Sequence, residues 1–419
     1  MSDFQKIIDN IASKGREASL LIQNQPADAI DKALLLMAGY LESDRARLQK
    51  ENEKDLEAGR QKGLSGAMID RLTLSDKTLA GMINGLREVA ALKSPVGEVY
   101  DERIRPNGLN ISKMRVPIGV IGIIYEARPN VTVDAAAICL KSRNAVILRG
   151  GSEAFHSNSA LCELFSRALE EAGLPAAALQ FIPTTDRAAV ELLLQKDEQV
   201  DLIIPRGGKG LIKMVVEKSR IPVIKHYTGV CHVFVSVNAD MAKALPIVIN
   251  AKTQRPGVCN AMETLLIDAS LDLQKKKDIV NALINKGVTL FGDDESRKLS
   301  DQIQVVDEAS LSDEYLDLRL SVITVNGLDG AINHINKYGS RHTDTIVTES
   351  TQEAEAFVMR VDTASVVVNA STRFSDGGEY GMGCEIGIST DKLHSRGPMG
   401  VEDLTTYKWV VRGDGQIRE

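Results

Sequence analysis

Cys259 is the residue whose type and setting point most directly to chemistry. It lies in a polar, glycine-bearing loop at 254–261, Gln-Arg-Pro-Gly-Val-Cys-Asn-Ala, just ahead of an apolar run at 263–267. This setting favours an accessible thiol, and a nearby cation or helix N-terminus would lower its pKa and increase the thiolate fraction. Cys384, in the loop Gly-Met-Gly-Cys-Glu at 381–385, is the rival candidate nucleophile.

The remaining cysteines favour packing over chemistry. The chain has five cysteines at scattered positions and no C-x-x-C pair, which is typical of reduced thiols and not of a disulfide framework or a zinc site. Cys139 and Cys162 lie in helical apolar patterns, where a buried cysteine acts as a small hydrophobe. The sequence therefore predicts no metal site.

Two glycine-bearing loops could hold a phosphorylated ligand. Segments 149–152, Arg-Gly-Gly-Ser, and 205–210, Pro-Arg-Gly-Gly-Lys-Gly, each stand between an apolar run and a helical pattern, where free N–H groups and the helix dipole attract phosphate. Two such loops suggest a dinucleotide, although neither carries G-x-G-x-x-G or a complete Walker sequence. The alternative is an ordinary turn with a solvated arginine. The candidate cofactor-binding residues are Arg149, Gly150, Ser152, Arg206, Gly207 and Gly208.

The elements that position these residues follow from the spacing of apolar side chains. Residues 1–92 have helical periodicity, with Ser75 placed as an N-cap, and Asn107-Gly108 between extended runs predicts a β-ribbon at 99–116. Short apolar runs then alternate with helical patterns, which indicates parallel β-α-β units. We expect strands in a first half at 118–125, 145–148, 179–182, 202–204 and 221–224, and in a second half at 233–237, 263–267, 288–291, 320–325, 345–347 and 365–368.

The predicted fold class is therefore α/β, with two doubly wound parallel-sheet domains and a small β element that includes an apolar strand at 407–411. Ligands of such sheets bind at the carboxyl ends of the strands. The composition, with 43% hydrophobic and 26% charged residues in 419, is that of a folded globular protein. A net charge of −7 disfavours nucleic acid, and the longest apolar stretch, 116–125, is too short for a membrane span. We expect a cytoplasmic protein.

Several long segments resemble one known family. Segment 117–131, the Cys259 loop, and segments 369–374, 393–400 and 404–408 are similar to the gamma-glutamyl phosphate reductase family of the aldehyde dehydrogenase superfamily. The resemblance covers essentially the whole chain. It implies reduction of L-glutamyl 5-phosphate to L-glutamate 5-semialdehyde by NADPH through a cysteine thioester, the second step of proline biosynthesis.

The resemblance also assigns roles to individual residues. Cys259 matches the superfamily's nucleophile, and Asn130 matches the asparagine of its oxyanion hole. Arg149 stands where the superfamily has a lysine near the adenosine ribose, so it is a plausible partner for the 2′-phosphate of NADP+. Glu314 resembles the glutamate that contacts the nicotinamide ribose. Arg255, Arg373 and Arg396 are candidate anchors for the substrate carboxylate and phosphate, and each could equally be a surface or interdomain arginine.

The implied subunit has three parts. Residues 1–98 and 117–229 form an NADP-binding domain, residues 230–390 a catalytic domain, and residues 99–116 and 402–419 an oligomerisation element. A homo-oligomer is expected, dimer or tetramer, and a glutamate 5-kinase is a possible partner.

One segment departs from the superfamily pattern. Oxidising aldehyde dehydrogenases carry Glu-Leu-Gly-Gly where this chain has His226-Tyr-Thr-Gly, so the glutamate that activates water for hydrolysis is missing. This suits an enzyme that passes an acyl group between phosphate and thiol. His226 is either a substrate contact or a structural or solvated histidine. A hydrolytic aldehyde dehydrogenase and a catalytically silent nucleotide-binding scaffold stay open as alternatives.

Overall fold

The computed structural model describes residues 3–126 and 128–418, so Met1, Ser2 and Glu419 at the ends of the predicted domains, and Ala127 in the family-like segment, lie outside the described residues. The chain forms two compact units. The first unit is Met1–Lys225 with Gly381–Gly387 and Met399–Glu419, and the second is His226–Tyr380 with Ile388–Pro398. The second unit is therefore inserted into the first.

The predicted N-terminal helical segment is confirmed. Ser75 caps the fifth helix as expected, because its hydroxyl accepts a hydrogen bond of 3.1 Å from the N–H of Thr78. The five helices are α1 (Asp3–Ile22), α2 (Ala27–Ser43), α3 (Arg45–Gln61), α4 (Gly66–Leu72) and α5 (Asp76–Ala91).

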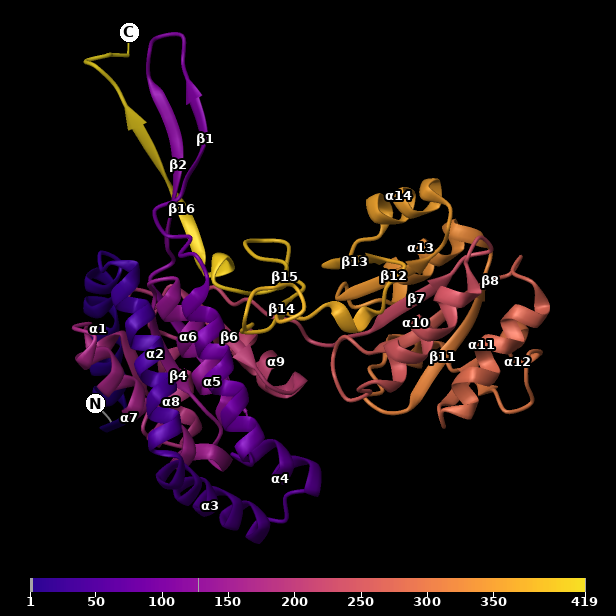
Figure 1. Cartoon of the computed structure of the whole chain (residues 1–419), viewed down its shortest axis with the longest axis horizontal. Coiled ribbons are helices and arrows are strands. Elements are labelled where there is room, and N and C mark those ends of the chain that lie inside the picture. The colour runs from indigo at the N-terminus through magenta and orange to yellow at the C-terminus, as the bar shows by residue number, and fades with distance from the viewer. Residues whose placement is uncertain (1–2, 127, 419) are drawn as a thin grey trace. The chain divides into compact units, whose positions relative to one another are not determined.

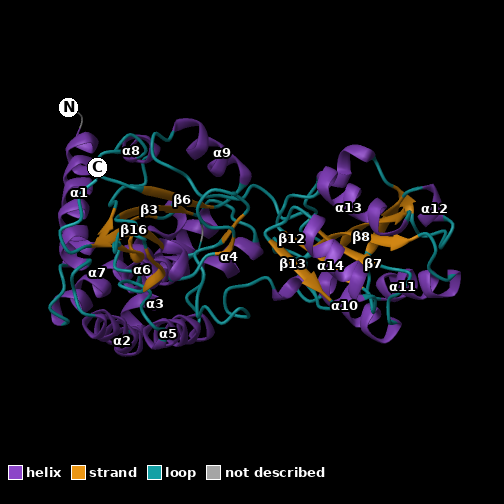
Figure 2. Cartoon of the chain, turned by 90° about the horizontal axis from the view of Figure 1, so that it is seen from above, coloured by secondary structure: helices purple, strands orange, loops and turns teal. Residues whose placement is uncertain are grey.

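A four-stranded parallel sheet forms the centre of the first unit, in the order β5-β4-β3-β6. Alternate residues of a strand face opposite sides: Ile121 and Ile123 pack into one apolar cluster, and Val120 and Ile124 into another. Helices cover both faces (Figure 2). The elements are β3 (Val120–Tyr125), β4 (Ala145–Arg149), β5 (Leu179–Phe181), β6 (Leu202–Arg206), α6 (Pro129–Lys141), α7 (Phe155–Glu171), α8 (Arg187–Leu193) and α9 (Lys209–Lys218), with single 3₁₀ turns at Ser152–Ala154 and Ala176–Ala178.

The strand expected at 221–224 is wrong. This segment makes only an isolated bridge, in which Pro222 accepts from the N–H of Ile203 and Ile224 donates back to the Ile203 carbonyl. A proline has no N–H to extend the ladder, and the chain leaves the first unit after Lys225.

The second unit contains a seven-stranded parallel sheet in the order β10-β9-β11-β8-β7-β12-β13. All six strands predicted for this half are present, while the two-residue strand β10 and the antiparallel pair β14-β15 were not predicted. The strands are β7 (Cys231–Val235), β8 (Met262–Asp268), β9 (Thr289–Gly292), β10 (Gln304–Val305), β11 (Arg319–Val325), β12 (Thr343–Val347), β13 (Ser365–Val368), β14 (Ile388–Ser389) and β15 (Gly397–Pro398). The helices are α10 (Met241–Thr253), α11 (Leu273–Asn285), α12 (Asp294–Arg297), α13 (Gly327–Tyr338) and α14 (Thr351–Arg360), with 3₁₀ turns at Glu308–Ser312 and Thr372–Phe374.

A three-stranded antiparallel ribbon completes the first unit. The predicted hairpin consists of β1 (Val99–Ile104) and β2 (Asn110–Pro117), and Gly108 adopts the positive φ of 84° that its turn requires. After a 3₁₀ turn at Glu402–Leu404, the C-terminal strand β16 (Thr405–Arg412) pairs with β2 along its whole length (Figure 1).

Among the described residues, no helix is both long and apolar enough to cross a membrane.

Candidate active site

Cys259 lies half-buried in the loop between α10 and β8, as its sequence setting predicts. The segment that follows His226 packs directly on this loop. At Gly229 a Cβ atom would stand 1.9 Å from the Cys259 carbonyl oxygen, so only glycine allows the approach. The Gly229 N–H donates to Oε1 of Glu314 at 2.9 Å. Glu314, predicted to contact a ribose, therefore also holds this segment against the Cys259 loop.

Two imidazoles accompany the thiol. A ring nitrogen of His226, the Cys259 Sγ and a ring nitrogen of His342 all lie within 4.8 Å of one another. The two rings meet edge to face with centroids 5.7 Å apart. His342, which sequence reasoning missed, is buried immediately before β12. His226 is therefore a half-buried neighbour of Cys259.

A second thiol lies behind this cluster. The Cys231 Sγ donates to the Cys259 carbonyl at 3.2 Å and lies 3.6 Å from Nδ1 of His342. Burial raises the pKa of Cys231 well above its usual value. Cys231 is thus a protonated packing residue that supports the loop of Cys259.

These residues sit at the amino ends of the strands, whereas the sequence predicts ligand sites at the carboxyl ends. His226 precedes β7, Cys259 precedes β8 and His342 precedes β12, and β12, β7 and β8 are neighbours in the sheet. Parallel strands bring their amino ends to one edge, so three segments that are distant in sequence meet there. In the first unit the candidate residues Arg149 and Arg206 do stand at carboxyl ends, as the last residues of β4 and β6.

A buried ion pair underlies the Cys259 loop. Lys252, in the last turn of α10, and Glu263, in β8, are both fully buried and their charged atoms are 2.7 Å apart. Burial raises the pKa of Glu263 to about 7 and lowers the pKa of Lys252. The other Glu263 oxygen accepts the Leu316 N–H at 3.2 Å. The sequence offered no signal for this pair.

The three candidate substrate arginines have different settings. Arg255 is exposed. Arg373 is partly buried and donates from Nε to Gln254 at 2.8 Å. Burial lowers its pKa, Asp376 opposes that shift, and Arg255 adds to it. These two arginines thus belong to the surroundings of the thiol. Arg396 instead pairs with Asp362 at 2.8 Å, a carboxylate that also binds Lys392 and Arg341.

Asn130 lies in the first turn of α6, and its amide donates to Asp134 at 3.0 Å. Burial raises the pKa of Asp134 to about 6. The same carboxyl group lies 3.9 Å from the Cys384 thiol, whose pKa is raised to about 12 by burial first and by Asp134 second. Cys384 is therefore protonated near neutral pH, which argues against it as the nucleophile.

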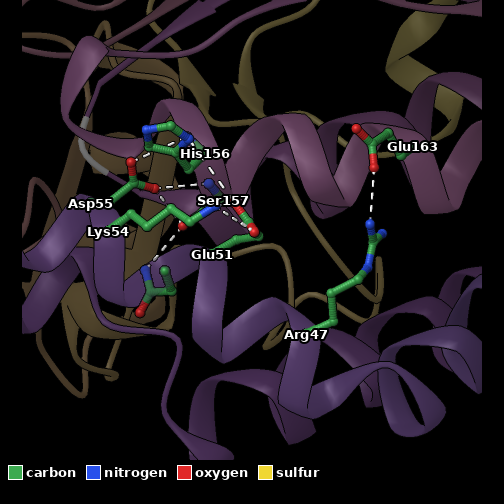
Figure 3. Close-up of polar contacts among 8 residues, drawn as sticks. Arg47, Glu51, Lys54, Asp55, His156, Ser157 and Glu163 are labelled. Carbon is green, nitrogen blue, oxygen red and sulfur yellow. Dashed lines mark hydrogen bonds and ion pairs between the residues drawn. The ribbon is translucent and has the colours of Figure 1, made fainter.

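The predicted cofactor loop at 149–152 leads into a helix whose N-terminus is already capped. Asp55 of α3 accepts the N–H groups of His156 and Ser157 at 3.1 and 2.8 Å and the Ser157 hydroxyl at 2.6 Å (Figure 3). Those N–H groups are thus satisfied within the chain and are not available to an anion.

Arg149 itself is nearly buried. Its Nη2 donates to the Thr185 carbonyl at 2.9 Å, and its Nε has no hydrogen-bond partner in the part of the chain that the structure describes. Burial lowers its pKa, the Glu153 carboxylate opposes that shift, and Arg187 adds to it. A guanidinium with an unused donor suits an anionic ligand, although Glu153 already places a carboxylate near it.

The second predicted loop is likewise held by a carboxylate. Oε2 of Glu126 accepts the Gly208 N–H at 2.8 Å at the start of α9, and a Cβ at Gly207 would stand 2.5 Å from the same oxygen. Arg206 packs against Gly387, where a Cβ would come within 2.3 Å of its guanidinium. Glu126 therefore occupies the anion position at this helix N-terminus.

Comparison with known proteins places the chain in a family. The sequence model described as the aldehyde dehydrogenase family matches residues 6–298. The chain therefore belongs to the aldehyde dehydrogenase family.

Several similar proteins within this family share one name. A protein of Geobacter metallireducens named gamma-glutamyl phosphate reductase is 54% identical over 412 residues, which cover 98% of this chain and 99% of the relative. A protein of the same name from Moorella thermoacetica is 53% identical over 97% of both chains. The crystal structure of gamma-glutamyl phosphate reductase from Thermotoga maritima matches with a TM-score of 0.96 and 43% identity, covering 98% of this chain and 100% of that one.

Proposed function

We propose that the protein reduces L-glutamyl 5-phosphate to L-glutamate 5-semialdehyde with NADPH and releases phosphate, the second step of proline biosynthesis from glutamate. The relatives named gamma-glutamyl phosphate reductase support the substrate and the reaction. The observation that carries the proposal in this chain is the setting of Cys259, whose thiol has the imidazoles of His226 and His342 beside it. The family resemblance implies that His226 replaces the glutamate that activates water in hydrolytic aldehyde dehydrogenases.

Cys259 performs the covalent chemistry. Its thiolate attacks the acyl carbon, a C–S bond forms, the C–O bond to phosphorus breaks, and phosphate departs with the electron pair. The tetrahedral species carries an oxyanion, for which the Cys259 N–H and the Asn130 amide are the proposed donors; losing one such donor typically costs about 3 kcal/mol. When bound, NADPH supplies the hydride that reduces the resulting thioester. Cleavage of the C–S bond then returns the thiolate and releases the semialdehyde.

The first unit supplies residues that fit NADPH. The Arg149 guanidinium, whose Nε has no hydrogen-bond partner among the described residues, suits a 2′-phosphate. Gly150 and Ser152 adjoin Arg149, and the loop of Arg206, Gly207 and Gly208 offers a second anion position if Glu126 moves aside. Glu314 is proposed to hold the nicotinamide ribose.

The substrate brings a carboxylate and a phosphate to the thiol, so cations must lie close to Cys259. Arg255 and Arg373 are the preferred anchors, because Arg255 stands in the Cys259 loop and Arg373 donates to Gln254 of the same loop at 2.8 Å. Arg396 is proposed as a weaker candidate, since Asp362 already neutralises part of its charge.

We further propose a cytoplasmic homo-oligomer that forms through the ribbon. Among the described residues, β16 pairs with β2 alone, so its other edge is unpaired. It also exposes three large apolar side chains, Tyr407, Trp409 and Val411. An unpaired strand edge of this kind is suited to contacts between subunits. Because an acyl phosphate is labile, a glutamate 5-kinase that makes it is a fitting partner.

The test uses the stable direction of the reaction. Purified protein receives glutamate-5-semialdehyde and NADP+, and NADPH formation is followed with and without phosphate. Strict dependence on phosphate supports phosphorolysis of the thioester. Equal rates without phosphate would overturn the proposal and favour the hydrolytic dehydrogenase, and no NADPH formation in either case would favour the silent scaffold.

A further inference from the structure

We propose that His226, Cys259 and His342 form a binding site for a soft divalent cation, with Zn²⁺ as the fitting ion, and that metal binding silences the enzyme. The site itself is inferred from geometry alone. The silencing rests on the proposed function, because it requires Cys259 to be the nucleophile.

The donor set has the dimensions of a metal site. One nitrogen from each ring and the Cys259 Sγ lie within 4.8 Å of one another. In a tetrahedral zinc centre the metal stands about 2.3 Å from sulfur and about 2.0–2.1 Å from nitrogen, so neighbouring donors are roughly 3.3–3.6 Å apart. The three atoms thus need to approach by an ångström or so, which rotation of the half-buried His226 and Cys259 side chains can supply.

The chemistry of the donors selects the ion. One thiolate and two imidazoles suit Zn²⁺, Cu⁺ and Co²⁺, whereas Mg²⁺ and Ca²⁺ need oxygen ligands. Three protein ligands leave a fourth coordination position open.

The scaffold holds these donors in place. Gly229 packs on the Cys259 backbone and is fixed by Glu314, so the segment that begins at His226 stays next to the thiol. No ligand spacing in the sequence indicates this site, because its three ligands come from segments far apart in the chain.

Metal binding and acyl transfer exclude each other. The cation replaces the thiol proton, which is released to solvent, and the sulfur lone pair that would attack the acyl carbon then bonds the metal. Bound Zn²⁺ is therefore expected to inhibit competitively against L-glutamyl 5-phosphate and to leave nucleotide binding largely intact.

The experiment uses cobalt as a spectroscopic probe on the full-length protein, freed of metal with a chelator and reduced with a phosphine. Titration with Co²⁺ is expected to produce one equivalent of bound metal, with a near-ultraviolet thiolate charge-transfer band and visible bands of a tetrahedral centre. Addition of Zn²⁺ is expected to abolish both bands.

Three variants test whether Cys259 and His226 are the ligands of the bound Co²⁺. Cys259→Ser should abolish the charge-transfer band, and His226→Asn should weaken Co²⁺ binding by about tenfold or more. His226 is only half-buried, so this variant avoids the folding risk of changing the buried His342. Cys162→Ser, which changes a buried thiol of the first unit, should leave the titration unchanged.

The outcomes separate this inference from the proposed function. A charge-transfer band that survives Cys259→Ser, or affinity that His226→Asn does not change, overturns the metal site whatever the activity. If Cys259→Ser removes the band but wild-type turnover is insensitive to saturating Zn²⁺, the site stands, and both the silencing and the role of Cys259 as nucleophile fail.

Discussion

Lys252 and Glu263 form an ion pair that is completely withdrawn from solvent, with Nζ and Oε2 only 2.7 Å apart. The pair joins the end of α10 to the start of β8, and the Cys259 loop connects these two elements. Burial of two charges costs free energy that their attraction only partly recovers. The pair is therefore better understood as fixing the two ends of the loop than as a source of stability.

Removing one member of this pair should be far more harmful than removing both. We expect Glu263→Leu to lower the free energy of unfolding by about 3–5 kcal/mol, because Lys252 is left with a buried, unpaired charge. The double variant Lys252→Met with Glu263→Leu should recover most of that loss. Urea unfolding of the three proteins measures this, and a single variant within about 1 kcal/mol of wild type would contradict it.

If Cys259 is the nucleophile, its removal should abolish turnover without weakening the binding of NADPH. Cys259→Ala should lose turnover by several orders of magnitude while its affinity for NADPH, measured by fluorescence titration, stays within about threefold of wild type. Cys162→Ala is the matched control and should keep its activity. Turnover of Cys259→Ala near the wild-type rate would remove Cys259 from the mechanism.

The same added methyl group should have a large effect on kcat at one glycine near Cys259 and a small effect at another. At Gly229 a Cβ would stand 1.9 Å from the Cys259 carbonyl oxygen, whereas at Gly257 the nearest atom is the Leu316 carbonyl oxygen at 3.7 Å. Gly229→Ala should therefore displace the nucleophile loop and lower kcat by at least about tenfold. Gly257→Ala, two residues from the thiol, should change kcat less than about threefold; equal effects of the two changes would argue against the packing described.

Asp134 should make stability depend on pH in a defined direction. Its pKa is about 6 in the folded protein against 3.8 in the unfolded chain. Between those values the folded protein keeps a proton that the unfolded chain releases, so its stabilising contribution is full below pH 3.8 and is lost as the pH rises through 6. The loss is about 1–3 kcal/mol, since part of the residue is accessible to solvent.

Asp134→Asn tests that dependence. The difference in melting temperature between Asp134→Asn and wild type, measured from pH 4 to 7, should move in favour of the variant as pH rises. Groups with the opposite dependence, such as His334, whose burial lowers its pKa to about 3, cancel in this difference. A difference that stays constant across the range would show that Asp134 does not titrate there.

Arg149 should discriminate between the two nicotinamide nucleotides. We expect Arg149→Gln to raise KM for NADPH by about tenfold or more and to change KM for NADH little, because only NADPH carries the 2′-phosphate. Glutamine keeps much of the side-chain bulk and a donor toward the Thr185 carbonyl. Equal changes for both nucleotides would indicate that Arg149 only supports the fold.

Most of the fold can be predicted from the sequence, because the strands are apolar runs bounded by turn residues. Val120 to Tyr125 and Met262 to Asp268 are buried on both faces, and such continuous apolar runs are typical of parallel strands under helices. The strands β10 and β14, of two residues each, are too short to leave a pattern. The segment 221–224 has the composition of a strand, but Pro222 and the exit to the second unit prevent a ladder.

The site was only half predictable for a different reason. The loop context of Cys259 is local, so it can be recognised without tertiary structure. The neighbours of Cys259 are not local: His342 is brought to it by pairing of β12 with β7 and of β7 with β8. Lys252 and Glu263 look like ordinary charged residues in sequence, and only the packing of α10 on β8 shows that both are buried.

The insertion of the second unit into the first has a consequence for synthesis on the ribosome. Ile386, Met399 and Leu404 belong to the same apolar cluster as Ile121 and Leu148, yet they are made only after residues 226–380. At ~5–20 residues per second, that interval lasts about 8–30 s. The nascent first unit must wait through it with an incomplete core and with β2 lacking its partner β16, so chaperone capture of this intermediate competes with completion of the fold.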